Sequence, residues 1–144
     1  MKVTAFNNHT YATNTTAPQF SVTWQYPPGP ENAPVHAFPN IKVESSVLPA
    51  GLRSLELVNF ELQWTYGVGN EAAASTDVQQ LTDNLVNANV AIDMFVDSDP
   101  TNAQSSTKAQ YEIMVWFADF GSAAQPLGLD QGVVSTQVLD GTTL

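Results

Sequence analysis

Residues 109–121, AQYEIMVWFADFG, form the most strand-like run of the chain. Because side chains on a strand alternate between its two faces, Glu112, Met114 and Trp116 share one face. The opposite face carries only apolar and aromatic side chains, at Tyr111, Ile113, Val115 and Phe117. This run therefore predicts a strand with one core face and one face on which a carboxylate lies beside a thioether and an indole.

Two interpretations of Glu112 remain open from this pattern. In the simpler one, an edge strand points the glutamate into water. A carboxylate among apolar neighbours, however, costs several kcal/mol to desolvate without partners, so chance rarely leaves one there. The second interpretation places Glu112 in a cleft beside an aromatic platform, an arrangement that suits carbohydrate hydrolysis.

The composition fits a single domain over residues 1–144 with an uncharged polar surface. Hydrophobic residues make up 43% of the chain, enough for a core, and charged residues only 12%, about half the usual share. The formal net charge is −10 with four Lys or Arg in all, which leaves no basic patch for phosphate backbones or anionic lipids. We therefore expect no nucleic-acid partner and no membrane partner.

This composition is typical of a secreted, extracellular protein. Two triplets, which begin at Asn8 and Asn14, also fit the N-glycosylation pattern. The N-terminal residues are polar and do not resemble a signal peptide, so we expect any signal to lie outside this chain.

Few residues can carry thiol or histidine chemistry. The chain has no cysteine, which excludes disulfides, thiol catalysis and thiolate metal sites. The two histidines, His9 and His36, do not have metal-binding spacing, and neither lies near a nucleophile-elbow motif.

Alternating patterns elsewhere predict an all-β domain, most simply an antiparallel sandwich. Strands are expected at 2–6, 10–13, 19–26, 37–43, 54–66, 87–97, 109–121 and 133–139. Residues 77–85 fit either a loop or a short helical turn capped by Asp77 or Thr76. The Asp140–Gly141 pair favours a hairpin, and the chain stops where its second strand should begin.

Several stretches resemble fungal glycoside hydrolase family 12, and within it the xyloglucan-specific endo-β-1,4-glucanases. They are 13–30 (TNTTAPQFSVTWQYPPGP), 34–40 (PVHAFPN), 86–99 (VNANVAIDMFVDSD), 111–121 (YEIMVWFADFG) and 125–128 (QPLG). The resemblance implies a β-jelly roll of two antiparallel sheets, with an open cleft for plant polysaccharides such as xyloglucan and cellulose. It also implies a retaining mechanism that needs no metal and no organic cofactor.

The resemblance assigns roles to individual residues. Glu112 matches the family's nucleophile, and Asp93 matches an acidic residue that hydrogen-bonds beside it. Met114 and Trp116 fall on the cleft side. Trp24 and Pro126 match motif positions, with Trp24 open between a sugar platform and core packing; core packing is favoured for Trp64. From the residues alone, Asp93 and Glu112 lie on the more polar faces of their strands. If they are adjacent, their carboxyl groups push each other's pKa values apart.

The chain also departs from the family. A retaining glycosidase needs two carboxyl groups about 5–5.5 Å apart. The family's acid/base lies in a later segment reading roughly Gly-Thr-Glu-Pro-Phe, whereas no glutamate follows Glu112 here. The family's opening strands are also missing, so we expect a family member cut at both ends, with exposed sheet edges and little or no turnover. Glu56, Glu61 and Asp97 are weak candidates for a substitute acid.

Three functions therefore stay open. The chain is a portion or shortened version of an endo-glucanase, or an inactive paralogue that binds glucan or a proteinaceous glucanase inhibitor as a decoy. The third function is assembly: the chain is a fragment whose strands are completed by another copy or another protein, through the exposed sheet edges.

Overall fold

The computed structural model describes residues 1–6, 19–27, 29–43, 46–123, 125–126, 128–139 and 142–143. Its regular structure is mostly strand, with one short α-helix and three single-turn 3-10 helices among these residues. The elements are β1 (Lys2–Ala5), β2 (Phe20–Thr23), η2 (Leu52–Ser54), α1 (Val78–Asp83), β3 (Ala88–Val96), η3 (Asn102–Gln104), β4 (Tyr111–Phe120), η4 (Leu129–Gln131), β5 (Val138–Leu139) and β6 (Thr142–Thr143).

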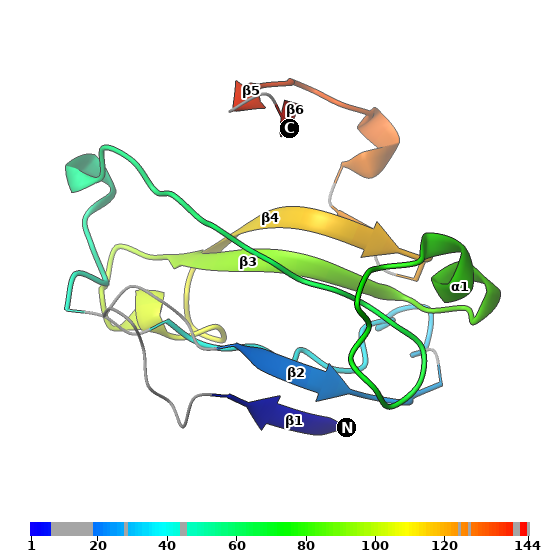
Figure 1. Ribbon diagram of the computed structural model, residues 1–144. Coiled ribbons are helices and arrows are strands. Elements are labelled where there is room, and N and C mark those ends of the chain that lie inside the picture. Colours follow the sequence, from blue (N-terminus) through cyan, green and yellow to red (C-terminus); the bar gives the residue numbers. More distant parts are fainter. Residues whose placement is uncertain are drawn as a thin grey trace.

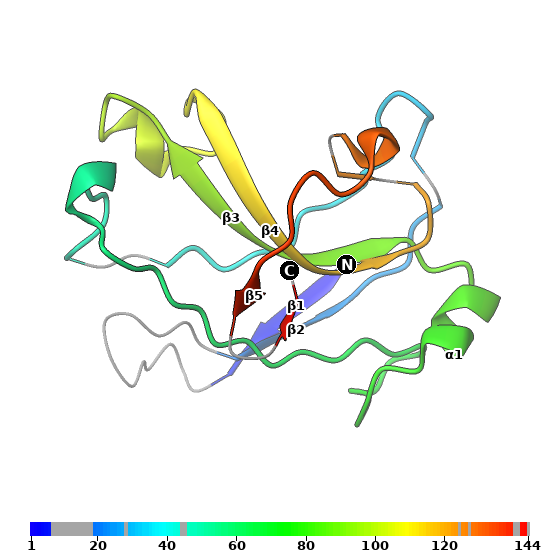
Figure 2. The same ribbon diagram turned by 90° about the horizontal axis from the view of Figure 1, so that it is seen from above.

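The long antiparallel pair of β3 and β4 lies at the centre of the molecule (Figure 1). Its register runs from Val96 opposite Tyr111 to Ala88 opposite Phe120. The β1–β2 pair lies on one side of it and the C-terminal segment with β5 and β6 on the other; seen from above in Figure 2, the C-terminal segment lies in front of the central pair and β1 and β2 lie behind it. Both strands of the central pair were predicted from their alternating patterns, and the structure confirms them.

A β-bulge interrupts the central pair near the end of β4. Ala91 lies opposite Trp116, but the next residue, Val90, lies opposite Ala118, so Phe117 is an extra residue on β4. The extra residue interrupts the alternation that predicted Phe117 on the Tyr111 face, and no ladder partner fixes the side of Phe117. Ala118 and Phe120 continue that face instead, because the inserted residue shifts the alternation by one position.

Two shorter pairs flank the centre. β1 pairs with β2 from Lys2 opposite Thr23 to Ala5 opposite Phe20, and the Phe6 N–H extends the ladder to the Gln19 carbonyl at 2.9 Å. β5 pairs with β6 through Val138 opposite Thr143, which confirms the hairpin predicted near the C-terminus.

The short helix α1 lies within residues 77–85, for which the sequence left a loop and a short helical turn open. The Asp77 side chain accepts a hydrogen bond from the Gln80 N–H at 3.0 Å, which is the expected N-cap contact. Leu81 points inward and is the one fully buried hydrophobic side chain among the described residues. The helix is only 6 residues long, so no described helix reaches the length needed to cross a membrane.

The expected sandwich is not closed. The described strands form three separate two-stranded sheets rather than two sheets packed as a jelly roll. Residues 37–43 and 133–137 were predicted as strand and have no strand structure, and the predicted strand at 10–13 lies outside the described residues. Most of 54–66, also predicted as a strand, is an unpaired extended run, because a strand needs a neighbour for its N–H and C=O groups.

The open architecture leaves much apolar surface in water. The chain exposes 11798 Å², whereas a compact monomer of this mass exposes roughly 7,200 Å². Large side chains such as Leu57, at 72% exposed, and Ile113, at 49%, contribute to this surface. The apolar faces that the sequence predicted as core are therefore formed but largely uncovered.

Candidate active site

The register of β3 and β4 brings the predicted acidic pair together. Glu112 lies opposite Phe95 and Met114 lies opposite Asp93, so Asp93 and Glu112 are diagonal neighbours on one face. Diagonal neighbours in an antiparallel pair are about 7–8 Å apart at the backbone and within reach of long side chains. Trp116, opposite Ala91, extends the same face. We call this surface the Glu112 face: Glu112, Met114 and Trp116 of β4, with Ala91, Asp93 and Phe95 of β3.

Both carboxyl groups of this pair are open to solvent. Asp93 and Glu112 are exposed, and neither takes part in a hydrogen bond within the described part of the chain. Partial desolvation by the surrounding protein raises the pKa of Asp93 above its ordinary value. Asp93 therefore holds a proton to a higher pH than a fully solvated aspartate, as the sequence interpretation requires. Coupling between the two titrations stays a prediction.

A third carboxylate, Asp97, follows β3 and lies diagonally across from Glu112 on its other side. It is used structurally, because Oδ1 accepts the Asp99 N–H at 2.8 Å and Oδ2 accepts the Gln110 N–H at 3.0 Å. The Asp99 N–H bond is the main cause that lowers the pKa of Asp97. A carboxyl group held in its charged form cannot serve as a general acid near neutral pH, so Asp97 closes the β3–β4 loop instead.

The other two suggested substitutes for an acid gain no support from the structure. Glu56 and Glu61 lie on the extended segment, which we define as residues 55–66. Both side chains are exposed, and because the segment pairs with no described strand, no register relates them to Glu112.

Met114 and Trp116 form an apolar surface next to the acidic pair. The Trp116 Nε1–H donates to Met114 Sδ at 3.4 Å, which orients the indole along its own strand. Met114 is exposed and Trp116 half-buried. A flat, partly exposed ring beside carboxyl groups can stack on the apolar face of a sugar while the carboxyl groups meet its hydroxyls.

The remaining tryptophans lie elsewhere. Trp24, Trp64 and Phe120 surround Tyr66 in edge-on and tilted contacts with ring centroids 5.4 to 6.1 Å apart. Phe120 lies opposite Ala88 in the register, on the face of the central pair that looks away from Glu112. The structure thus joins Trp24 and Trp64 in an aromatic cluster and does not bring Trp24 to the Glu112 face, so sugar binding by Trp24 stays a prediction.

The aromatic cluster is anchored by Tyr66. Its hydroxyl donates to the Asn89 carbonyl at 2.9 Å, and its backbone N–H donates to Thr76 Oγ1 at 3.0 Å. Burial raises the pKa of Tyr66 above its usual range. Its contacts therefore hold the end of the extended segment against β3.

Pro126 is exposed in the loop between β4 and η4, where its carbonyl accepts the Leu129 N–H at 3.2 Å. Nothing in this placement brings Pro126 to the Glu112 face, so its contact with sugar also stays a prediction.

Strict alternation missed one residue of the Glu112 side, Asp119. Asp119 lies opposite Asn89, and only the bulge places it on the side of Glu112.

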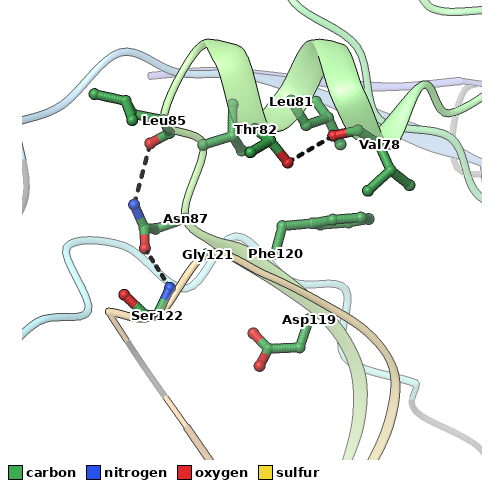
Figure 3. Close-up of a pocket in the computed structure, with 10 residues that line it drawn as sticks. Val78, Leu81, Thr82, Leu85, Asn87, Asp119, Phe120, Gly121 and Ser122 are labelled. Atoms are coloured by element: carbon green, nitrogen blue, oxygen red, sulfur yellow. Dashed lines mark hydrogen bonds between the residues drawn. The ribbon is translucent and has the colours of Figure 1, made fainter.

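One open cavity of about 390 Å³ lies where α1 meets the end of β4. Figure 3 shows Phe120 beneath α1 and Asp119 turned away from the helix. No group of three or more ionisable side chains in the described ranges is placed to hold a metal ion.

The sequence model of glycosyl hydrolase family 12 matches residues 54–144, more than half of the chain. The match includes Asp93, Glu112, Met114, Trp116 and Pro126, and it leaves out the resembling stretches at 13–30 and 34–40. No curated protein and no solved structure matches the chain.

Proposed function

Because this chain belongs to glycosyl hydrolase family 12, we propose that its Glu112 face binds a β-1,4-glucan and supplies the nucleophile of a retaining hydrolysis. Membership of the family implies β-1,4-glucan hydrolysis as the activity. The observation that carries the proposal for this chain is the register, which sets Asp93 diagonal to Glu112 on an exposed face with Trp116 beside them.

The chemistry assigns different roles to the two carboxyl groups. A carboxylate oxygen of Glu112 attacks the anomeric carbon, and the bond from that carbon to the leaving oxygen breaks with its electron pair. Asp93, whose pKa is raised by desolvation, keeps its proton and donates a hydrogen bond to the other Glu112 oxygen, which holds the charged nucleophile in place. The leaving oxygen then needs a proton from a second acid.

None of the described carboxyl groups on or beside the Glu112 face is suited to be that acid. Asp97 is committed to backbone N–H groups, and in this proposal Asp93 supports Glu112. The partners of Asp119 and Glu112 on β3, Asn89 and Phe95, are six positions apart, which is about 20 Å along a strand. The described residues therefore supply the nucleophile and its neighbour, and we expect little turnover of an ordinary glucan.

The finer substrate and the complete fold are also proposals. The resemblance of residues 86–99 and 111–121 to xyloglucan-specific members favours xyloglucan over unbranched glucan. The uncovered apolar faces support the family's two-sheet jelly roll as the complete domain. A polar surface with few charges supports secretion.

A glycoside that leaves without protonation tests the nucleophile separately from the acid. We expect a fluorinated cellobioside with a dinitrophenolate leaving group to release one equivalent of dinitrophenolate and add its glycosyl mass to Glu112. Peptide mass spectrometry locates the ester, and Glu112→Gln is the control. Labelling elsewhere, or none in protein shown to be folded by circular dichroism, contradicts the proposal.

The lack of a suitable acid beside Glu112 among the described residues favours one alternative, a glucan-binding or inhibitor-binding protein without turnover. Hydrolysis of xyloglucan by the purified chain distinguishes the two. Reducing ends that appear with the natural chain and vanish in Glu112→Gln require an acid within this chain. Tight glucan or inhibitor binding, with labelling but no reducing ends, supports the binding function. Concentration-dependent dimers would instead indicate assembly through the exposed sheet edges.

A further inference from the structure

The bulge at Phe117 changes which acidic residue faces the substrate side of β4. With strict alternation, Ala118 and Phe120 would follow Trp116 on the Glu112 face. The extra residue reverses this order, so that Asp119, opposite Asn89, takes the Glu112 side. Phe120 instead takes the opposite side and packs beneath α1 (Figure 3).

The end of β4 that carries Asp119 is held firmly. Asn87 Oδ1 accepts the N–H groups of Ser122 and Ala123 at 3.0 and 2.9 Å, and Asn87 Nδ2 donates to the Leu85 carbonyl at 3.1 Å. Gly121 has φ 82° and lies so close to Asn87 that a side chain would collide with its amide. This clamp fixes the turn directly after Asp119 without using the Asp119 carboxylate.

The Asp119 carboxylate itself is exposed and has no partner among the described residues. Its two oxygens can accept several hydrogen bonds, and a solvated carboxylate gives up little hydration at an exposed site. A neutral glycan offers many hydroxyl donors and no charge that the net charge of −10 would repel.

We propose that Asp119 is a sugar-binding residue at the far end of the Glu112 face, where its carboxylate accepts hydrogen bonds from hydroxyls of a glucosyl unit several units away from the bond that Glu112 attacks. The inference rests on the proposed function. It has a specific consequence: since Asp119 is about 20 Å from Glu112 along the strand, only a long oligosaccharide can contact both.

The test is calorimetric binding of cello-oligosaccharides of increasing length to folded Glu112→Gln protein, which prevents turnover. We compare it with Asp119→Ala and Asp119→Asn in the same background. The control is Glu71→Ala, which also removes one exposed negative charge but lies in the loop 67–76. We expect Asp119→Ala to weaken binding of the long oligosaccharides about three- to tenfold and to leave the short ones and Glu71→Ala unchanged.

The outcomes separate the two proposals. If Trp116→Ala weakens binding but Asp119→Ala does not, the role of Asp119 is wrong and the proposed function stands. An equal loss for short and long oligosaccharides also overturns the role of Asp119, because a contact at the far end cannot affect a short ligand. If the folded protein binds no oligosaccharide of any length, both proposals fall.

Discussion

The central β3–β4 pair and the extended segment carry the same kind of sequence pattern and reach different structures. Residues 88–96 and 111–120 alternate and form a continuous ladder. Residues 55–66 alternate just as regularly, with Val58, Phe60 and Leu62 on one side, yet have no strand partner and leave those side chains exposed. Alternation thus predicts which side chains share a face. Pairing with a neighbouring strand decides whether that face belongs to a sheet that can hold functional side chains in place.

The largest expected effect separates the glutamates of the two regions. Glu112→Gln removes the proposed nucleophile, so labelling by the activated cellobioside should fall by a factor on the order of 10³ to 10⁶. Glu61→Gln, on the extended segment, should leave the labelling rate unchanged. Stopped-flow absorbance of dinitrophenolate measures both. A comparable loss in Glu61→Gln would show that the segment contributes to the site.

Truncation of a leucine in each region compares their packing. Leu81→Ala removes the fully buried side chain beside β4 and should lower the free energy of unfolding by about 2–5 kcal/mol. Leu57→Ala, on the extended segment, should change it by less than about 0.5 kcal/mol. Urea unfolding followed by circular dichroism gives both values. Equal losses would mean that the segment is covered in solution.

Tyr66 is the point where the extended segment meets the ladder. Tyr66→Phe removes the hydrogen bond to the Asn89 carbonyl and should destabilise the fold by about 1 kcal/mol. Because burial raises the pKa of Tyr66 in the folded state, natural protein should lose stability as pH rises above about 10. The variant should lack this loss. Thermal unfolding across alkaline pH tests the prediction, and parallel curves for both proteins would contradict it.

The smallest expected effects on stability concern Asp93 of β3 and Asp97 of the loop that follows it, and these two effects have opposite signs. The pKa of Asp93 is raised, so its contribution to stability falls as pH rises through the acidic range, and Asp93→Asn should slightly stabilise at neutral pH. The pKa of Asp97 is lowered, so its contribution is present at neutral pH and lost on acidification.

Asp97→Asn should therefore destabilise the protein at neutral pH, and the difference from natural protein should shrink as pH falls below about 3.8. Melting temperatures of both variants from acidic to neutral pH provide the measurement. Shifts of the same sign in Asp93→Asn and Asp97→Asn would show that net charge, rather than local contacts, controls stability.

Local patterns predicted much of the central region. The alternation around Glu112 and Asp93 identified β3 and β4, and Asp77 was one of two candidate caps for a possible helical turn, because these signals depend on neighbouring residues. The β-bulge at Phe117 was not predictable, since no turn or glycine signal precedes it. Without the bulge, the alternation places Asp119 on the face opposite Glu112, so the sequence did not indicate Asp119 as a site residue.

In the candidate site, too, features set by neighbouring residues were predictable and features set by distant contacts were not. The shared face of Glu112, Met114 and Trp116 follows from a spacing of two residues, which any strand imposes. The approach of Asp93 to Glu112 needed the register, which depends on contacts far apart in the chain. The alternatives for Trp24 stayed open for the same reason, because its strand pattern does not reveal that its ring meets Tyr66.

Trp116, which contacts Met114 on the Glu112 face, can report ligand binding through its intrinsic fluorescence. The chain has three tryptophans, of which Trp24 and Trp64 contact Tyr66 in the aromatic cluster and Trp116 lies on the Glu112 face. If a glycan stacks on Trp116, as proposed, it should displace water from the indole and shift its emission. Changes in the aromatic cluster alter the signal of the other two. Fluorescence of single-tryptophan variants can thus follow ligand binding and packing separately, without an added dye.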